Sequence, residues 1–345
     1  MQDVRNKKVF VGLSGGVDSA VSAALLQKAG AHVTGVFIKG WYPPGMPCTW
    51  SEDRRDAMRA AAHLGIPFHT LDASKEYREG VIDYLLKEYA LGRTPNPDIM
   101  CNKEVKFGVF WEFAQRNDAD FIATGHYAIQ KDGHLYRGVD ESKDQSYFLW
   151  AASKDALSHT LFPLGSMRKE ETRRIAKELN LPQATKSDSQ GICFLGNVSV
   201  EEFLKSELGV AVGEAKDKAG NLIGTHEGTV LATLGERVSL SGALPGPWYV
   251  VAKDMRTNML TVAHSVQEQG VCEHVALSQT HLLATSALEG DLEAQYRYHG
   301  PSISGRLSAD AQSFIPHGVL LEAVAPGQSL VFYRDNELLG GGIIE

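Results

Sequence analysis

The stretch that decides the fold of this chain is Leu13-Ser14-Gly15-Gly16-Val17-Asp18-Ser19. An apolar run, Val9-Phe10-Val11, precedes it and an apolar-periodic run, residues 20–29, follows it, which predicts a strand, a glycine turn and a helix. The two glycines let backbone N–H groups crowd around an anion, because no Cβ stands in the way. The helix that begins near Val17 directs its free N–H groups and the positive end of its dipole at the same point. The run therefore predicts a site for the phosphates of a nucleotide.

The polar side chains of this loop add a second expectation. Ser14 and Ser19 offer hydroxyl donors, whereas Asp18 is out of place in a pure anion cradle. A divalent cation between the carboxylate and the phosphates removes the conflict, so we expect Mg²⁺ to accompany the nucleotide near Asp18. The loop lacks the lysine of a Walker loop and the spacing of a dinucleotide loop. It resembles the SGGxDS loop of ATP pyrophosphatases, which cleave ATP between its α and β phosphates; an ordinary glycine-rich turn is the alternative.

Composition bounds the class of protein. The chain has 345 residues, 43% of them hydrophobic and 22% charged, which is typical of a soluble globular enzyme with two or three domains. No apolar run approaches the ~20 residues that span a bilayer, and residues 1–8 lack a signal peptide's apolar core, so we expect a cytoplasmic protein without a membrane partner. The net charge of −8 argues weakly against nucleic acid but leaves room for a local basic face. Candidates for that face are Lys103, Lys106, Arg168, Lys169, Arg173, Arg174 and Lys177. For any one of them taken singly, a solvated helix position is the preferred interpretation.

The first half of the chain alternates between strand-like and helix-like patterns. Strands are predicted at Val9–Leu13, His32–Ile38, Phe68–Leu71 and Asp120–Thr124, and helices at Ser19–Ala29, Glu52–Leu64, Glu76–Ala90 and Lys103–Arg116. This alternation predicts a parallel sheet with helices on both faces. Nucleotides bind at the carboxyl ends of the strands in such sheets, which is where the glycine loop falls.

The second half has a different texture. Residues Arg168–Leu179 predict a charged helix with Ile175, Ala176 and Leu179 on its apolar side. Beyond Gly209, short β-like runs alternate with glycine and proline, at Thr229–Leu234, Trp248–Val251, Met259–Val262, Val319–Leu321 and Leu330–Phe332. We therefore expect three domains: a catalytic domain at 1–208, a small β-rich domain at 209–268 and a β-barrel-like domain at 269–345.

The four cysteines are Cys48, Cys101, Cys193 and Cys272. They are far apart and form no C-x-x-C pair, so neither a disulfide scaffold nor a dedicated metal cage is expected. The prolines of Thr94–Asp98 predict a stiff loop and no regular helix, so that a following helix would begin close to Cys101. A helix N-terminus favours the thiolate, and Asp98 is within reach as an acid or base. A buried, inert cysteine is the alternative, and it is the preferred local interpretation for Cys193.

Taken together, these elements resemble one family, the tRNA-specific 2-thiouridylases, over essentially the whole chain. The matching stretches are Gly12–Ser19, Thr94–Lys103, Ala123–Ala128, Lys143–Leu149, Ser189–Phe194, Gly242–Val251 and Ala325–Ser329. The resemblance implies an α/β fold: a parallel-sheet, adenine-nucleotide alpha-hydrolase-like (PP-loop) domain, then a small β-rich central domain and a C-terminal β-barrel-like domain. It also implies ATP-dependent 2-thiolation of the wobble uridine in tRNA anticodons, with Lys, Glu and Gln tRNAs expected.

The resemblance implies roles for individual residues. Those that would bind ATP are Gly12, Leu13, Ser14, Gly15, Gly16, Val17, Asp18, Ser19, Ile38 and Gly125. Asn96, Pro97 and Asp98 would hold the target base, and His126, Lys143, Asp144, Gln145, Arg297, Tyr298 and Gln328 would contact tRNA. Cys193 would carry sulfur as a persulfide, Cys101 would be the nucleophile, and Asp98 would move the proton. Cys48, Cys272 and the loop Trp41–Trp50 match no role.

In the implied reaction, transfer of AMP onto the C2 oxygen of uracil turns that oxygen into a leaving group, and sulfur then attacks C2. The Cys193 persulfide attacks directly, or Cys101 first frees hydrosulfide from it; either route can end in a Cys101–Cys193 disulfide. We expect ATP, Mg²⁺, a monomer, and a sulfur-relay protein or cysteine desulfurase as the donor. The alternatives are an amide-forming ATP pyrophosphatase, a thiolase for another tRNA position, and a nucleotide-sensing RNA-binding protein without catalysis.

Overall fold

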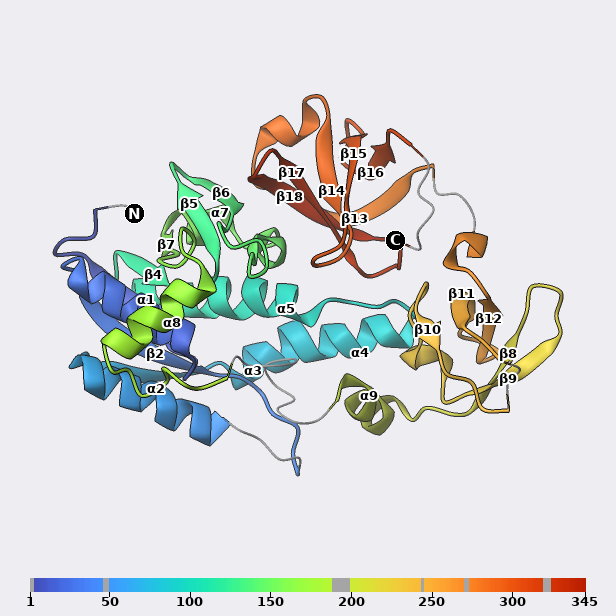
Figure 1. Ribbon diagram of the computed structural model, residues 1–345, viewed down its shortest axis with the longest axis horizontal. Helices are drawn as coiled ribbons and strands as arrows, with labels where there is room; N and C mark the ends of the chain where they lie inside the picture. The colour runs from blue at the N-terminus through green and yellow to red at the C-terminus, as the bar shows by residue number, and fades with distance from the viewer. Residues whose placement is uncertain (1–2, 46–49, 188–198, 243–244, 270–272, 319–323) are drawn as a thin grey trace. The chain divides into compact units, whose positions relative to one another are not determined.

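The computed structural model describes residues 3–45, 50–187, 199–242, 245–269, 273–318 and 324–345. Within it the chain forms two compact units (Figure 1). The first unit consists of Met1–Ile82, Pro97–Val198 and Asp335–Leu338, and the second of Asp83–Asn96, Ser199–Arg334 and Leu339–Glu345. No helix in the described ranges is long and apolar enough to cross a membrane.

A parallel sheet forms the centre of the first unit. Its strand order is β3-β2-β1-β4-β7, and every neighbouring pair runs parallel. The strands are β1 (Lys8–Gly12), β2 (His32–Lys39), β3 (Phe68–Asp72), β4 (Phe121–Ala123) and β7 (Thr160–Leu161). The predicted parallel sheet is therefore confirmed, and the glycine loop follows its central strand.

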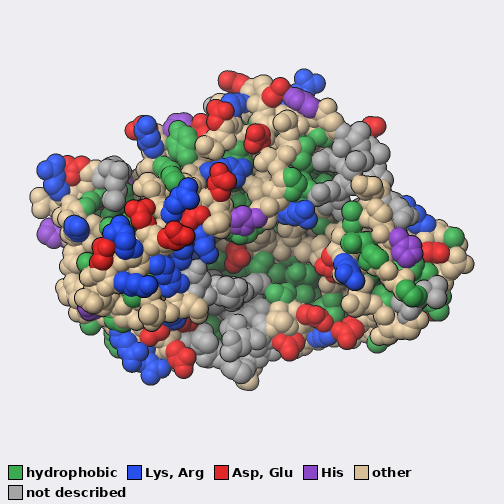
Figure 2. Space-filling view, in the orientation of Figure 1, with side chains coloured by type: hydrophobic (Ala, Val, Ile, Leu, Met, Phe, Trp, Pro, Cys, Tyr) green, Lys and Arg blue, Asp and Glu red, His purple; other side chains and the backbone are tan. Residues whose placement is uncertain are grey.

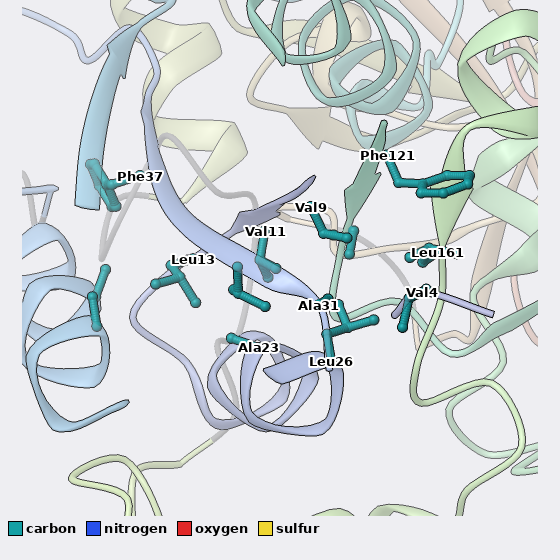
Figure 3. Packing of buried hydrophobic residues seen from close by; sticks show 14 residues of the cluster. Val4, Val9, Val11, Leu13, Ala23, Leu26, Ala31, Phe37, Phe121 and Leu161 are labelled. Carbon is teal, nitrogen blue, oxygen red and sulfur yellow. The ribbon is translucent and has the colours of Figure 1, made fainter. Parts of the chain in front are cut away.

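Helices cover both faces of this sheet. Because side chains alternate along a strand, Val9 and Val11 point to the face covered by α1 (Val17–Lys28) and α2 (Trp50–Leu64), where they pack with Ala23 and Leu26 (Figure 3). Phe10 points the other way, and its ring centroid lies 5.9 Å from that of Phe113 in α6 (Phe110–Arg116). Strand β1 is thus buried on both sides, which is why its sequence is a continuous apolar run.

Two long helical segments contain π-helical stretches. The first runs through α3 (Ser74–Tyr77), η1 (Arg78–Ile82) and α4 (Asp83–Ala90), and the second through α5 (Pro97–Met100), η2 (Cys101–Val109) and α6. The prediction that the second helix begins near Lys103 is wrong. Pro97 occupies its first helical position, where a missing N–H group is tolerated, so the proline starts the helix instead of preventing it.

The remainder of the first unit surrounds this core. It comprises the hairpin β5 (Ala128–Lys131) and β6 (His134–Arg137), the 3₁₀ turn η3 (Ser146–Leu149), α7 (Lys154–Ser158) and α8 (Lys169–Glu178). In α8, Thr172 and Ala176 are buried and Ile175 packs against the core, as its periodicity predicts in part. Leu179, expected on the same apolar side, is 40% exposed because α8 ends one residue earlier.

The second unit contains a small sheet preceded by helix α9 (Val200–Leu208). Its order is β10-β11-β12-β8-β9, from β8 (Gly213–Lys216), β9 (Leu222–His226), β10 (Arg237–Val238), β11 (Trp248–Asp254) and β12 (Met259–Ala263). The strand predicted at Thr229–Leu234 is wrong: Thr229–Leu231 form the 3₁₀ turn η4. The backbone N–H and the hydroxyl of Thr229 both donate to Asn258 Oδ1, at 3.0 and 2.9 Å, and hold this turn.

A barrel follows in the same unit, apart from the first two residues of its last strand. Its strands run in the order β13-β16-β15-β14-β17-β18, and β13 also pairs with β18, which closes six strands within the described residues. They are β13 (Val275–Leu282), β14 (Leu292–Gln295), β15 (Ser302–Leu307), β16 (Ser313–Pro316), β17 (Ser329–Arg334) and β18 (Glu337–Ile344). Phe314 and Phe332 are stacked inside it, with ring centroids 6.5 Å apart. The predicted β-rich and barrel parts are confirmed; the run Val319–Leu321 lies outside the described residues.

Candidate functional site

The loop between β1 and α1 is shaped for an anion. Gly15 has a φ of +79°, and a Cβ there would lie 2.5 Å from the backbone oxygen of Asp53, so only glycine fits. Ser19 Oγ accepts from the backbone N–H of Ser14 at 3.2 Å and lies 3.1 Å from the oxygen of Gly16, to which it donates. The N-cap residue of α1 is Gly16, which makes no side-chain capping hydrogen bond, so the first-turn N–H groups suit a bound anion as acceptor.

Asp18 in this loop is held by two other elements. Its carboxylate oxygens lie 2.8 and 2.7 Å from Nζ of Lys169 in α8, and the hydroxyl of Tyr127 donates to it at 2.9 Å. The ammonium balances the carboxylate, so the loop presents no net negative charge to an arriving phosphate. The sequence names Lys169 only as one candidate for a basic face; Figure 2 shows Lys and Arg side chains gathered over α8.

Dedicated metal ligation is absent from the described part of the chain, where no group of three or more His, Cys, Asp or Glu side chains could hold an ion. Asp18 is the one carboxylate inside the glycine loop. A cation at Asp18 therefore has to share the carboxylate with Lys169 or displace it.

Two further strand ends complete this edge of the sheet. Gly125 follows β4, and a Cβ on it would lie 2.9 Å from the backbone nitrogen of Ser19 and 3.0 Å from Asp18. Ile38 is partly buried near the end of β2, in register with Leu71. Since the carboxyl ends of neighbouring parallel strands meet at one edge, Gly12–Ser19, Ile38 and Gly125 lie along the same edge.

Replacing Gly125 by alanine is expected to weaken ATP binding by about 10-fold or more, because the added methyl group pushes against the backbone of the loop that is expected to hold the phosphates. The measurement is the Kd of ATP by calorimetry. The matched control is Gly318→Ala, since a Cβ there meets nothing within 4 Å. Equal ATP affinity in both variants would show that the close contact between Gly125 and the backbone of Asp18 and Ser19 does not affect nucleotide binding.

Asp98 and Cys101 lie one turn apart on the second long helix, with Asp98 partly buried and Cys101 5% exposed. Burial raises the pKa of the Asp98 carboxyl above its ordinary value, and the nearby charge of Lys106 opposes that rise. A raised pKa suits a carboxyl that takes up and returns a proton near neutral pH. Cys101 lies beyond the first helical turn, so the N-terminal position expected for it is wrong and the dipole acts on it weakly.

Asn102 beside this pair was not predicted. It is 2% exposed, and its Nδ2 donates to the backbone oxygen of Phe148 at 3.0 Å. Its Oδ1 is buried without a hydrogen-bond partner among the described residues. Nothing in the local sequence distinguishes it from an exposed asparagine.

His126 is buried between aromatic rings. Its ring centroid lies 5.8 Å from that of Phe107 and 6.2 Å from that of Phe162, and its Nδ1 lies 2.7 Å from Thr124 Oγ1. Burial, with Lys106 as a second cause, lowers the pKa of His126 well below its ordinary value. In this structure His126 is therefore a neutral, enclosed side chain next to Gly125, beyond the carboxyl end of β4.

The turn at Lys143–Gln145 is tied into the first unit. Asp144 is buried and accepts from the backbone of Gly138 at 2.8 Å and from the hydroxyl of Ser146 at 2.9 Å. Gln145 Oε1 accepts from the backbone N–H of Tyr127 at 3.1 Å. Lys143 and Gln145 keep partial exposure, so this turn presents a mixed surface above a fixed backbone.

The predicted contacts in the barrel differ from one another. Arg297 and Tyr298 are exposed, and the Arg297 guanidinium lies 5.6 Å from the ring centroid of Tyr296, an arrangement suited to stacking on bases and pairing with phosphates. Gln328 instead donates from Nε2 to the backbone oxygen of Thr94 at 2.6 Å. Asn96 is partly buried in the same unit. Cys193, Cys48 and Cys272 lie outside the described residues.

Family models cover nearly all of the chain. A tRNA methyl transferase HUP domain matches residues 7–197, a tRNA methyl transferase PRC-barrel domain 201–264, and an aminomethyltransferase beta-barrel domain 273–344. A protein named tRNA-specific 2-thiouridylase MnmA from Enterococcus faecalis is 40% identical over 100% of this chain and 97% of its own. The protein of that name from Idiomarina loihiensis is 43% identical, over 99% of this chain and 96% of its own. One from Geobacillus kaustophilus, named MnmA 1, is 41% identical, with 99% and 96% covered.

Proposed function

Since this chain belongs to the tRNA-specific 2-thiouridylase family, we propose that it replaces the C2 oxygen of the wobble uridine in tRNA anticodons by sulfur, with cleavage of ATP. The observation that carries the proposal is the pairing, in one compact unit, of a glycine-dependent anion loop with a partly buried Asp98 beside Cys101. An anion loop alone fits any ATP pyrophosphatase. A thiol beside a proton-accepting carboxyl is what sulfur transfer adds.

ATP lies, in this proposal, along the carboxyl edge of the sheet. Gly12–Ser19 hold the phosphates through backbone N–H groups, Gly125 leaves the space they need, and Ile38 supplies an apolar contact for adenine. Mg²⁺ bound with the phosphates near Asp18 would supply positive charge against the departing pyrophosphate. Lys169 is placed to move from Asp18 to the phosphates when that carboxylate takes another partner.

Sulfur transfer uses the two thiols. The C2 oxygen of uracil attacks the α phosphate, pyrophosphate leaves, and the oxygen becomes part of AMP. A terminal sulfur carried on Cys193 then displaces AMP from C2, either while attached or as hydrosulfide after Cys101 attacks the persulfide. In the first route Cys101 then attacks Sγ of Cys193, which breaks the bond to the transferred sulfur and frees the thiolated base. In the second route the attack of Cys101 on Sγ of the Cys193 persulfide has already formed the same bond. Both routes end in a Cys101–Cys193 disulfide that an external reductant opens. Asp98, whose raised pKa follows from burial, accepts and returns the proton.

The tRNA substrate would be bound by both units. Asn96, Pro97 and Asp98 hold the flipped base, which leaves a single-stranded anticodon loop more easily than a helix. The remaining proposed contacts are His126, Lys143, Asp144, Gln145, Arg297 and Tyr298. The proposed substrates are Lys, Glu and Gln tRNAs, and the proposed sulfur donor is a relay protein or a cysteine desulfurase. We propose a cytoplasmic monomer whose domains are residues 1–208, 209–268 and 269–345.

Thiolation of unmodified tRNA tests the proposal. Purified protein is incubated with Mg²⁺, a persulfide source and tRNA, with and without ATP, and nucleosides are identified by mass. The matched substrate control carries cytidine at the wobble position. We expect 2-thiouridine only with ATP and only from the uridine substrate. Release of pyrophosphate that depends on an amine acceptor, with no thiouridine, would assign the chain to amide formation instead.

A further inference from the structure

The segment Gly92–Asn96 is held by hydrogen bonds to residues far away in the sequence. It belongs to the second unit and leads directly into Pro97 and Asp98, the residues proposed to meet the target base. Its backbone makes hydrogen bonds to the small sheet domain and to the barrel of that unit. The residues that make these bonds have no place in the reaction described above, apart from Gln328.

The barrel holds Thr94 on both sides of its peptide unit. Gln328 Nε2 donates to the oxygen of Thr94 at 2.6 Å, and the N–H of Thr94 donates to the oxygen of Pro326 at 2.8 Å. Gly327 lies between these two partners with a φ of +89°, and a Cβ on it would come within 2.8 Å of the Thr94 nitrogen. The backbones approach this closely only because the residue is glycine.

The small sheet domain holds the preceding residues. Nζ of Lys253 in β11 donates to the oxygen of Gly92 at 3.1 Å and also to the oxygen of Ala232. The hydroxyl of Thr94 donates to Thr233 Oγ1 at 3.2 Å. Burial lowers the pKa of Lys253 to about 8, which means that burying the charged amine costs folding stability. Stability therefore does not explain why a lysine occupies this position.

The helix that precedes the segment fixes Arg93 as well. Nε and Nη2 of Arg93 donate to the two carboxylate oxygens of Glu88 at 2.5 and 2.6 Å, and Glu88 is buried. A bidentate pair of this kind fixes direction as well as distance. Gly92, Arg93 and Thr94 are therefore all held, and Pro95 and Pro97 limit the backbone freedom that remains around Asn96.

We propose that Gln328 and Lys253 are positioning residues, which hold the backbone of Gly92–Thr94 and thereby fix Asn96, Pro97 and Asp98 for the target base. This inference rests on the proposed function. It gives Gln328 a role other than the RNA contact expected from the resemblance, because an Nε2 hydrogen already donates to Thr94. A small displacement of Asn96–Asp98 would misalign the base with its reactants, and a misplacement of about 1 Å can lower a rate roughly 100-fold.

Kinetics separate positioning from RNA contact. Gln328→Met and Lys253→Met keep the side-chain length and remove the donor, so we expect kcat for thiolation to fall roughly 10- to 100-fold while the Kd of tRNA changes less than about twofold. Gln312→Met, an exposed glutamine on the same barrel, is the matched control and is expected to keep both values. A raised Kd with unchanged kcat in Gln328→Met would overturn the proposal and support direct RNA contact.

Hydrogen exchange gives a readout that does not need turnover. In the full-length Gln328→Met variant, backbone amides in residues 94–101 are expected to exchange faster than in the wild type, at an unchanged melting temperature. Unchanged exchange in this segment would overturn the proposal even if thiolation proceeds. If Gln328→Met exchanges faster but the wild-type protein makes no 2-thiouridine, the positioning role of Gln328 is retained and the proposed function is rejected.

Discussion

Cys101→Ser is expected to lower tRNA thiolation by about 10³-fold or more while ATP binds normally. A serine hydroxyl is close in size to the thiol, so it fits a side chain that is 5% exposed, but it is a far weaker nucleophile and cannot form a disulfide. The measurement is 2-thiouridine formed per enzyme, with the Kd of ATP measured in parallel.

Cys272→Ser is the matched control, because the resemblance assigns no role to that thiol, and it should thiolate at the wild-type rate. Full activity in Cys101→Ser would remove Cys101 from the mechanism and contradict both routes, because each of them ends in the Cys101–Cys193 disulfide. Loss of ATP binding together with activity would show that the substitution disturbs the helix that begins at Pro97.

Asp98→Asn is expected to lower kcat by about 10²- to 10⁴-fold and, at neutral pH, to raise the melting temperature. Burial raises the folded-state pKa of Asp98, so the folded protein holds this proton more tightly than the unfolded chain does. Ionised Asp98 therefore opposes folding at any pH above its folded pKa. Asparagine carries no charge, so Asp98→Asn gains its full stability relative to the wild type at pH values above the folded pKa. This gain in stability vanishes below the unfolded pKa of 3.8.

The matched control is Asp310→Asn, for which the sign reverses. The Ser308 hydroxyl donates to Asp310 at 2.6 Å and lowers the pKa of that carboxyl. Its stabilising effect is present above the unfolded pKa and is lost as the pH falls through the folded pKa. We expect Asp310→Asn to lower the melting temperature slightly at neutral pH and to leave kcat unchanged. A lower melting temperature for Asp98→Asn would contradict the buried-acid assignment.

Much of the first unit follows from local sequence. The centre of strand β1, Val9–Val11, is apolar because it is covered on both faces, and Gly15 marks the turn that only glycine permits. The helix at Pro97 was missed for a physical reason as well. A proline disfavours helix in the residues that precede it but not in those that follow it. Pro97 is therefore compatible both with a loop and with the start of a helix.

Contacts that join distant residues could not be predicted from sequence. Lys169 reaches Asp18 across 151 positions, and Gln328 reaches Thr94 across 234. No periodicity encodes such pairs, because each depends on how distant segments pack together within one unit. The same holds for His126, whose enclosure comes from Phe107 and Phe162 on other elements.

The most direct test of the central claim follows the oxygen that sulfur replaces. An anticodon stem-loop carrying ¹⁸O at C2 of the wobble uridine is thiolated with ATP, and the AMP, phosphate and pyrophosphate are weighed by mass spectrometry. The account predicts one ¹⁸O atom in AMP for each 2-thiouridine formed, because the C2 oxygen leaves on the α phosphate. Label in phosphate or pyrophosphate, or thiouridine formed with unlabelled AMP, would contradict adenylation of the base.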